Sequence, residues 1–522
     1  MRIIDYFDNG VKYYPDNVAF IDIDDGGASM SYAQAQPVTH RIAAAMHANG
    51  YQQGSHVGIL APNSSIAFLT LLGLFRAEGV WLPINPRNAV ATNVDLLTRF
   101  DGELLFYHTE FEQEAKEILA AVPGIREAVC INGEGNVGKS LDAWCADCPS
   151  IHAAGPVDMD AVFAVFPTGG TTGKSKGVVM NHRNIYTMYQ NFYSHFNYHD
   201  DTCHLVVAPM THSAGLIGCM HFARGGTNAI MSKAAPDLIC DAIEKYRVTH
   251  LFLPPTVVYM MLALPDVQQR DYSSLQHLLV GAAPTSLKKL KEAIAVFGPV
   301  MTEAFGQSEA PAAITAKAPW DYMDRDGTIN ERRLASIGRP CVNNRVAILD
   351  DDGNETDTGV AGEICIQGEL VTPGYYKNPE ATAEVRAFGW HHTGDIGVMD
   401  EEGFITIVDR KKDMIITGGF NVFPNEVEQV LSAHPAVQEC AVIGVPDEKW
   451  GEAVKAVIQL KPGSECEANT LIELCKQELG SVKAPKSVDF IPDLPRSAAG
   501  KVLKTDLRKA YWDGQGRAVN LC

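Results

Sequence analysis

The chain has 522 residues, of which 46% are hydrophobic and 20% charged, which is enough apolar material for several domains. Its formal net charge of −20 excludes a general electrostatic attraction to nucleic acid or anionic lipid, so a polyanionic ligand must be held by local positive charge. No signal sequence is evident at the N-terminus, and apolar stretches such as 66–75 are shorter than the roughly 20 residues of a membrane-spanning helix. We expect a cytoplasmic protein with no nucleic-acid partner and no integral membrane segment.

Helical patterns alternate with short apolar strands in the first 155 residues. A helix is predicted from Ser31 to His47 and another from Ser64 to Arg76, and strands are predicted at 56–60 and 80–84. Cys145 and Cys148 form a C-x-x-C pair without a second pair at zinc spacing, so we expect reduced thiols. Strands separated by helices of about 10–15 residues indicate a parallel α/β sheet.

The segment 167–177 lies between apolar runs at 161–166 and 178–180, both predicted strands. Its glycines let backbone N–H groups turn inward, and its threonines and lysines add donors and charge, which together suit phosphate oxygens. The spacing is one residue short of a Walker A motif. A flexible glycine linker is the alternative, but it does not explain the hydroxyls and paired lysines. We interpret the segment as a phosphate loop of a different kind.

Four further predicted strands end in segments with glycine or proline and polar groups: 204–208, 249–253, 277–280 and 300–305. The carboxyl ends of strands in open parallel sheets are where ligands bind. From about 336 the pattern changes to short alternating strands and tight turns, typical of a small antiparallel sheet or barrel. Residues 409–413 are charged and predicted to be an exposed domain boundary. A compact α+β domain follows, with helices at 427–431 and 471–479 and strands at 441–445 and 453–460.

Five motifs in register resemble those of the adenylate-forming superfamily, which includes acyl-CoA synthetases. They are residues 168–177, 305–309, 393–395, 409–419 and 495–501. The resemblance covers nearly the whole chain. It implies an α/β fold with a large N-terminal domain at 1–409, made of two α/β subdomains and a small β-barrel at about 336–409. It also implies a small mobile α+β C-terminal domain at 410–522 that carries the catalytic lysine.

The reaction that this resemblance implies has two steps: a carboxylate attacks the α-phosphorus of ATP to give acyl-AMP and pyrophosphate, and the thiol of coenzyme A then displaces AMP. Such a site needs Mg²⁺ and positive side chains around the developing charge. Lys501, Glu309, His212 and Thr172 are the implied catalytic residues, with Glu309 and Thr172 on the metal. A neutral, packed histidine is the alternative for His212. The implied ATP-binding residues are Thr168, Gly169, Gly170, Thr171, Thr172, Gly173, Lys174, Lys176, Gly281, Ala282, Ala283, Ala304, Phe305, Gly306, Gln307, Ser308, Asp395, Arg410 and Lys501.

The resemblance also implies that the C-terminal domain rotates about Asp409 between the two steps. Lys412, Gly418 and Gly419 would then contact coenzyme A. Several positions depart from the usual family pattern, because Gly169, Ser175, Phe305 and Ser308 stand where serine, proline, tyrosine and threonine are commoner. None of these departures removes Lys501, Glu309 or Asp395, so we expect an active enzyme.

The acyl group is expected to be apolar, either fatty or aromatic. The segment 211–213 lacks the carboxylate with which amino-acid-activating relatives pair the substrate ammonium. The pocket candidates are Val207, His212, Gly215, Phe252, Gly306 and Ala310. We therefore predict an acyl-CoA synthetase, with a homodimer left open. The alternatives are an adenylating enzyme that loads a carrier protein, and a catalytically silent nucleotide-binding homologue.

Overall fold

A computed structural model describes residues 1–149, 151–152, 155–168, 175–196, 198, 201–281, 285–496 and 502–512. Contacts divide these residues into two compact units. The first unit holds the described residues of 1–168, 175–345 and 366–389, and the second holds those of 346–365 and 390–512. Each unit is described by itself below. The predicted α/β fold, with a large N-terminal part and a smaller C-terminal part containing sheets and helices, is confirmed.

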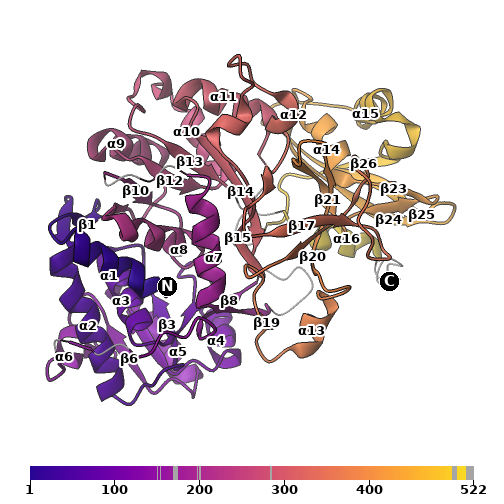
Figure 1. The fold of residues 1–522 in the computed structure, drawn as a ribbon. Helices are drawn as coiled ribbons and strands as arrows, with labels where there is room; N and C mark the ends of the chain where they lie inside the picture. Colours follow the sequence, from indigo (N-terminus) through magenta and orange to yellow (C-terminus); the bar gives the residue numbers. More distant parts are fainter. Residues whose placement is uncertain are drawn as a thin grey trace. The chain divides into compact units, whose positions relative to one another are not determined.

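An eight-stranded sheet lies in the first unit, in the order β19-β9-β8-β4-β3-β5-β6-β7. Figure 1 labels its strands β3, β6, β8 and β19. Its strands are β3 (His56–Leu60), β4 (Val80–Pro83), β5 (Leu104–Tyr107), β6 (Glu127–Cys130), β7 (Lys139–Ser140), β8 (Val162–Pro167), β9 (Gly177–Asn181) and β19 (Gly374–Tyr375). The strands from β8 to β7 are parallel, whereas β9 pairs antiparallel with both β8 and β19. The predicted strands around 167–177 are therefore the two arms of a hairpin.

A nine-stranded sheet forms the rest of this unit, in the order β16-β15-β14-β13-β12-β10-β11-β1-β2. Its strands are β1 (Val18–Asp22), β2 (Ala28–Ser31), β10 (Cys203–Val206), β11 (Thr227–Ile230), β12 (His250–Leu253), β13 (His277–Val280), β14 (Met301–Gln307), β15 (Ala310–Lys317) and β16 (Arg339–Pro340). The six strands from β14 to β1 are parallel, and antiparallel strands are added at both edges.

Amphipathic helices accompany both sheets, and their starts match the sequence signals. Ser31 and Gln34 form the capping box of α2, and the Ser64 hydroxyl caps α3. The helices of this unit are α1 (Ile3–Tyr13), α2 (Tyr32–Ala48), α3 (Ser65–Arg76), α4 (Val90–Arg99), α5 (Glu112–Ala121), α6 (Leu141–Trp144), α7 (His182–Tyr193), α8 (Ser213–Met220), α9 (Pro236–Tyr246), α10 (Pro255–Leu262), α11 (Leu287–Phe297), α12 (Glu331–Leu334) and α13 (Pro379–Glu384).

The second unit contains two smaller sheets. The strands β17 (Arg345–Leu349), β18 (Gly362–Gln367), β20 (His391–Met399) and β21 (Ile405–Arg410) form one sheet in that order. The other has the order β23-β22-β25-β24, with β26 beside β25. Its elements are β22 (Ile415–Thr417), β23 (Phe420–Val422), β24 (Val437–Asp447), β25 (Gly451–Leu460) and β26 (Ser487–Phe490), with α14 (Pro424–Ser432), α15 (Ala468–Lys483) and α16 (Lys504–Trp512). The domain boundary at Asp409 stays a prediction.

The amino ends of three parallel strands carry a row of buried histidines. His204, His250 and His277 are cross-strand neighbours on β10, β12 and β13. The ring of His221 stacks on that of His204, with the ring centroids 4.5 Å apart. Burial lowers the pKa of both His204 and His277 to about 4. His204 and His277 are therefore neutral packing groups at pH 7.

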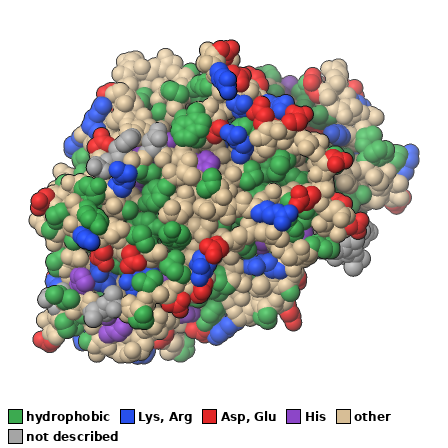
Figure 2. Space-filling view, viewed as in Figure 1, with side chains coloured by type: hydrophobic (Ala, Val, Ile, Leu, Met, Phe, Trp, Pro, Cys, Tyr) green, Lys and Arg blue, Asp and Glu red, His purple; other side chains and the backbone are tan. Residues whose placement is uncertain are grey.

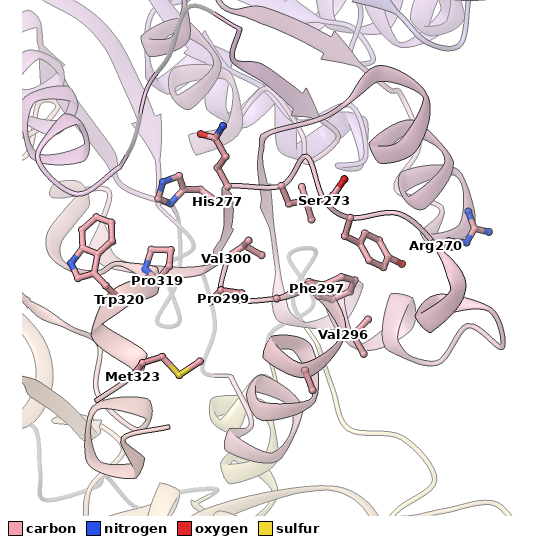
Figure 3. Close-up of a pocket in the computed structure, with 15 residues that line it drawn as sticks. Arg270, Ser273, His277, Val296, Phe297, Pro299, Val300, Pro319, Trp320 and Met323 are labelled. Carbon is pink, nitrogen blue, oxygen red and sulfur yellow. The ribbon is translucent and has the colours of Figure 1, made fainter. Parts of the chain in front are cut away.

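A cavity of about 850 Å³ opens at the amino ends of β13 and β14. Figure 3 shows Trp320 and Met323 on one side of it and Phe297 on the other, with His277 at the start of β13. The cavity lies at the opposite end of β13 from Gly281, so it does not belong to the predicted site. Nothing in the structure indicates a ligand for it.

Eleven cysteines of the described residues, Cys145 and Cys148 among them, are free thiols. Cys148 in the first unit and Cys466 in the second are partly exposed, whereas the other nine are buried. None of the described helices has the length and apolar composition of a membrane span. On the face drawn in Figure 2, basic and acidic side chains are interspersed.

Candidate active site

The ends of the predicted phosphate loop are closed by the β8–β9 hairpin. Pro167 pairs with Gly177, the N–H of Thr168 donates to the carbonyl of Lys176 at 2.8 Å, and the N–H of Lys176 approaches the Thr168 hydroxyl at 3.3 Å. The Arg99 guanidinium of α4 donates to the carbonyl of Ser175. The structure therefore fixes where the loop leaves and re-enters the sheet. The predicted ligands Gly169, Gly170, Thr171, Thr172, Gly173 and Lys174 lie outside the described residues.

Glu309 lies in the turn between β14 and β15, and three hydrogen bonds hold it. Its carboxylate oxygen Oε1 accepts from the hydroxyl of Tyr375 at 2.6 Å. Its carbonyl accepts from both the N–H and the hydroxyl of Thr372, at 2.9 and 3.1 Å. The ammonium of Lys176 lies 4.8 Å from the centroid of the same Tyr375 ring. The structure therefore brings together the predicted metal ligand and a lysine of the predicted phosphate loop.

The end of β14 opens to solvent where the motif begins. Met301 and Thr302 are buried, whereas residues 303–309 are all partly exposed. At Gly306 a Cβ atom would lie 2.5 Å from the backbone nitrogen of Ala312, which itself has a φ of +55°. The hairpin register shifts at this point, between Phe305 and Gln307. Only glycine fits there, so this motif position is set by backbone packing as well as by any ligand.

Gly281, Phe252 and Ala304 lie together at the ends of neighbouring strands. A Cβ on Gly281 would be 3.4 Å from the Phe252 ring and 3.5 Å from the Ala304 carbonyl. A predicted adenine-side residue and a predicted acyl-pocket residue are therefore in direct proximity. Ala282 and Ala283 lie outside the described residues.

The segment after β10 leads to His212, which is the N-cap residue of α8. His212 stays accessible to solvent, but the protein atoms around it desolvate the imidazole enough to lower its pKa. Gly215 packs its α-carbon against the Met210 carbonyl, where a Cβ would come within 2.3 Å. Of the other predicted pocket residues, Val207 and Ala310 are buried in packed surroundings.

Asn63, just beyond β3, fastens this segment to the sheet. Its side-chain amide donates to the carbonyls of Ala208 and Met231 at 3.0 and 3.1 Å, and its side-chain oxygen accepts from the N–H of Met210 at 2.9 Å. One side chain thus satisfies three backbone groups at the carboxyl ends of two strands.

In the second unit, the motif residues Asp395 and Arg410 face each other across β20 and β21. They are register partners, and the Arg410 Nε lies 2.9 Å from the Asp395 carboxylate. Asp395 is buried, whereas the guanidinium of Arg410 is half-exposed. The two residues predicted to contact ribose and phosphate are therefore brought together as an ion pair.

Glu363 of β18 joins the two motifs of this unit. Its Oε1 accepts from the N–H of Gly394 at 2.9 Å, while its Oε2 lies 3.2 Å from the Lys411 ammonium and 3.0 Å from His392 Nδ1. Glu363, Cys365 and His392 are close enough to hold a metal ion in principle. However, both carboxylate oxygens already have donors, so the cluster is a satisfied polar network.

Asp409, the predicted hinge, is buried at the end of β21 rather than exposed, so the prediction of an exposed patch at 409–413 is wrong for this residue. Its carboxylate accepts from its neighbour Arg410 N–H and from the Asn425 N–H at the start of α14, both at 2.7 Å. Burial raises the pKa of Asp409 to about 6, and the nearby Lys504 ammonium opposes the rise. Lys504 itself pairs with Glu428 of α14 at 2.7 Å.

Gly418 and Gly419 form the two-residue turn of the β22–β23 hairpin. Their φ values of 57° and 82° fit a turn that needs two left-handed residues. The N–H of Gly418 donates to the Trp450 carbonyl at 2.8 Å, and a Cβ on Gly418 would meet the Trp450 ring at 2.6 Å. Lys412 is exposed. Lys501 lies outside the described residues, three positions before α16.

Three polar residues of these sites were not found by sequence reasoning: Tyr375, Asn63 and Glu363. Asn63 follows a predicted strand, which is the same signal that marked the other strand ends. Tyr375 lies in Gly374-Tyr375-Tyr376, and nothing local points to Glu309, which lies 66 residues earlier.

Parallel sheets with a predicted phosphate loop and a carboxylate at the strand ends are typical of α/β enzymes that bind nucleotides. The chain matches the AMP-binding enzyme family over residues 7–376 and the AMP-binding enzyme C-terminal domain over residues 426–501. It belongs to this family, within the adenylate-forming superfamily.

Relatives of known activity cover nearly the same length. The chain is 36% identical over 490 residues to the medium/long-chain-fatty-acid–CoA ligase FadD8 of Mycobacterium tuberculosis, covering 91% of this chain and 84% of that one. It is 34% identical over 488 residues to a feruloyl-CoA synthase of Amycolatopsis sp, with 93% and 95% covered. The ATP-bound structure of MatB from Rhodopseudomonas palustris superposes with a TM-score of 0.87 at 28% identity, over 98% and 99% of the two chains. The predicted enzyme class, an AMP-forming acid–CoA ligase, is confirmed.

Proposed function

We propose that this chain activates an apolar fatty or aromatic carboxylic acid as acyl-AMP and transfers the acyl group to coenzyme A. In the first step an oxygen of the acid attacks the α-phosphorus of ATP, and the bond to pyrophosphate breaks. In the second step the thiol sulfur attacks the acyl carbon, AMP leaves, and the thiol proton passes to solvent or a base. The observation that carries this proposal is the grouping of Glu309, Tyr375 and Lys176 beside the ends of the loop 168–177.

Glu309 is suited to a Mg²⁺ ion. Among the described residues no donor contacts its second carboxylate oxygen, Oε2, so a hard anionic ligand remains available. A bound Mg²⁺ would supply charge neutralisation for the polyphosphate, and Thr172 is the other predicted ligand. Lys176 would add a positive charge from the protein itself, and Lys501 would stabilise the charge that develops between the acid and the α-phosphate.

Asp395 and Arg410 are proposed to bind the ribose and phosphates, as an acceptor and a donor. Their ion pair in the second unit supports this role, since each holds the other in position until a nucleotide hydroxyl or phosphate replaces it. Gly418 and Gly419 are proposed to admit the pantetheine arm, because a glycine turn presents bare backbone to a slender ligand.

Rotation about Asp409 between the two steps remains a proposal. Support comes from the position of Asp409 near the end of β21, where its carboxylate also accepts from the Asn425 N–H in the first turn of α14. The cytoplasmic location and a homodimer are likewise kept as predictions.

A panel of carboxylic acids with ATP, Mg²⁺ and coenzyme A tests the proposal. Each acid is scored by AMP release and by the mass of the thioester. We expect AMP and thioester in equal amounts for aliphatic or aromatic acids. Pyrophosphate exchange without a thioester would instead indicate an enzyme that loads a carrier protein, and ATP binding without either product would indicate a silent homologue.

A further inference from the structure

The short strand β19 connects the two sheets of the first unit. Tyr375 of β19 pairs with Val178 of β9, and the N–H of Tyr376 donates to the Gly177 carbonyl at 2.7 Å. β9 begins two residues after Ser175, so the backbone of Tyr375 is fixed to the strand that leaves the predicted phosphate loop. Its side chain, however, reaches the turn after β14, in the other sheet.

The contacts with Glu309 fix both its backbone and its carboxylate. Thr372 holds the Glu309 carbonyl with two hydrogen bonds, and the Tyr375 hydroxyl donates to Oε1 at 2.6 Å. Burial of Tyr375, together with the adjacent Glu309 charge, raises the pKa of its phenol, so the hydroxyl stays protonated and remains a donor. The carboxylate therefore has one oxygen immobilised and the other available.

Lys176 contacts the same ring from the phosphate-loop side. Its ammonium lies 4.8 Å from the ring centroid, within the range of a cation–π contact. Within the described part of the chain no ion pair joins Lys176 directly to Glu309. A direct ion pair would neutralise both charges, whereas a shared neutral ring keeps an anion and a cation close while leaving each able to bind a ligand.

We propose that Tyr375 is a positioning residue that sets the Glu309 carboxylate, and with it the Mg²⁺ of the Mg²⁺–ATP complex, relative to the phosphate loop. This inference rests on the proposed function, because it assumes that Glu309 is the metal ligand. Tyr375 touches neither substrate in this account. It acts through Glu309 and Lys176.

Binding of a non-hydrolysable ATP analogue, measured by calorimetry with saturating Mg²⁺ and with EDTA, tests this role without turnover. The ratio of the two dissociation constants is the gain in affinity due to Mg²⁺. Tyr375→Phe removes only the hydroxyl, so we expect this gain to fall by roughly tenfold, the scale of a hydrogen bond to a charged group, while affinity in EDTA is unchanged. Tyr376→Phe is the matched control, because the Tyr376 hydroxyl donates to the exposed Asp101 at 2.6 Å, and the gain should stay at the wild-type value.

Glu309→Gln provides the reference and completes a double-mutant cycle. It should abolish the gain, and Tyr375→Phe should then have no further effect in that background. Suppose that folded Tyr375→Phe keeps the wild-type gain in affinity due to Mg²⁺, while Glu309→Gln loses it. That result would overturn the role of Tyr375 and leave the proposed function standing. An undiminished gain in Glu309→Gln would overturn both. If Tyr375→Phe is unstable, Glu309→Asp tests the same contact, since its shorter side chain withdraws the carboxylate from Tyr375.

Discussion

The two ends of the same parallel strands in the first unit have opposite chemistry. At their amino ends, His204, His250 and His277 are buried in a row of rings. At the carboxyl end of β13 Gly281 is partly exposed, and so are residues 305–309 at the end of the neighbouring strand β14. The comparison teaches that a titratable residue indicates function only when its side chain keeps its charge and its access to solvent in the folded protein. Burial lowers the pKa of His204 and His277 and leaves them as neutral packing groups.

Replacing Lys501, the predicted catalytic lysine, should have the largest effect on activity. Lys501→Ala is expected to leave the protein folded and to cut adenylation by roughly 10² or more, the scale seen when a positioned charge-stabilising group is lost. Pyrophosphate exchange measures this step. The control is Lys509→Ala on α16, an exposed lysine whose ammonium pairs with Asp506 of the same helix. Near-normal AMP formation by Lys501→Ala would refute the assignment.

Acid should destabilise the first unit through the buried histidines at the amino ends of its strands. The pKa of His204 and of His277 is lowered to about 4 by burial, so the unfolded chain binds their protons first. Their contribution to stability is complete above about pH 6.5 and is lost as the pH falls towards 4, by up to about 3 kcal/mol for each histidine. Urea unfolding at several pH values, followed by a spectroscopic signal from the first unit, measures how the unfolding free energy changes with pH.

His221→Phe sharpens that test. Both ring nitrogens of His221 are buried without a partner among the described residues, and burial holds its pKa well below the ordinary value. An apolar ring should therefore be tolerated at pH 7 and should make the loss of stability in acid shallower. If the unfolding free energy of His221→Phe falls with pH as steeply as that of the wild type, the row of buried histidines does not govern stability in acid.

Asn63→Ala should have a smaller effect, at the carboxyl ends of the parallel strands. It leaves the Ala208 and Met231 carbonyls and the Met210 N–H without their partner, which should cost about 1–3 kcal/mol of unfolding free energy. Because residues 208–210 lead to His212, the KM for the acid should rise as well. Asn354→Ala, in an exposed turn, is the control. If both the unfolding free energy and the KM stay at their wild-type values, Asn63 has no role in the site.

The smallest effect is expected in the second unit. Gly418→Ala places a Cβ against Trp450 in a turn with positive φ, which costs on the order of 1 kcal/mol. Thioester formation from synthetic acyl-AMP should slow several-fold while pyrophosphate exchange stays unchanged. Equal loss in both half-reactions would contradict a role confined to coenzyme A.

Local pattern was sufficient to predict many elements. The strand at 277–280 is found as His277–Val280, and the helix after Ser64 begins and ends as predicted, because apolar periodicity and a capping hydroxyl are both local signals. The antiparallel pairing of β14 with β15 was not predicted. It depends on the close approach of Gly306 to Ala312, which periodicity does not encode.

Distant partners explain what sequence reasoning missed at the sites. Asp409 looked exposed among charged neighbours, but Asn425 of α14 and the Lys504 ammonium surround it. Tyr375 gave no signal because its partner Glu309 lies on another sheet. By contrast, the pairing of Asp395 with Arg410 joins two residues that the family resemblance had already marked.

The distribution of free thiols has a practical consequence for watching the enzyme work. Cys148 and Cys466 are the partly exposed thiols of the described residues, and they fall in different units. With Cys522 replaced, a fluorescent donor and acceptor could be attached to these native positions. Energy transfer between the dyes would then test whether one unit moves against the other during turnover.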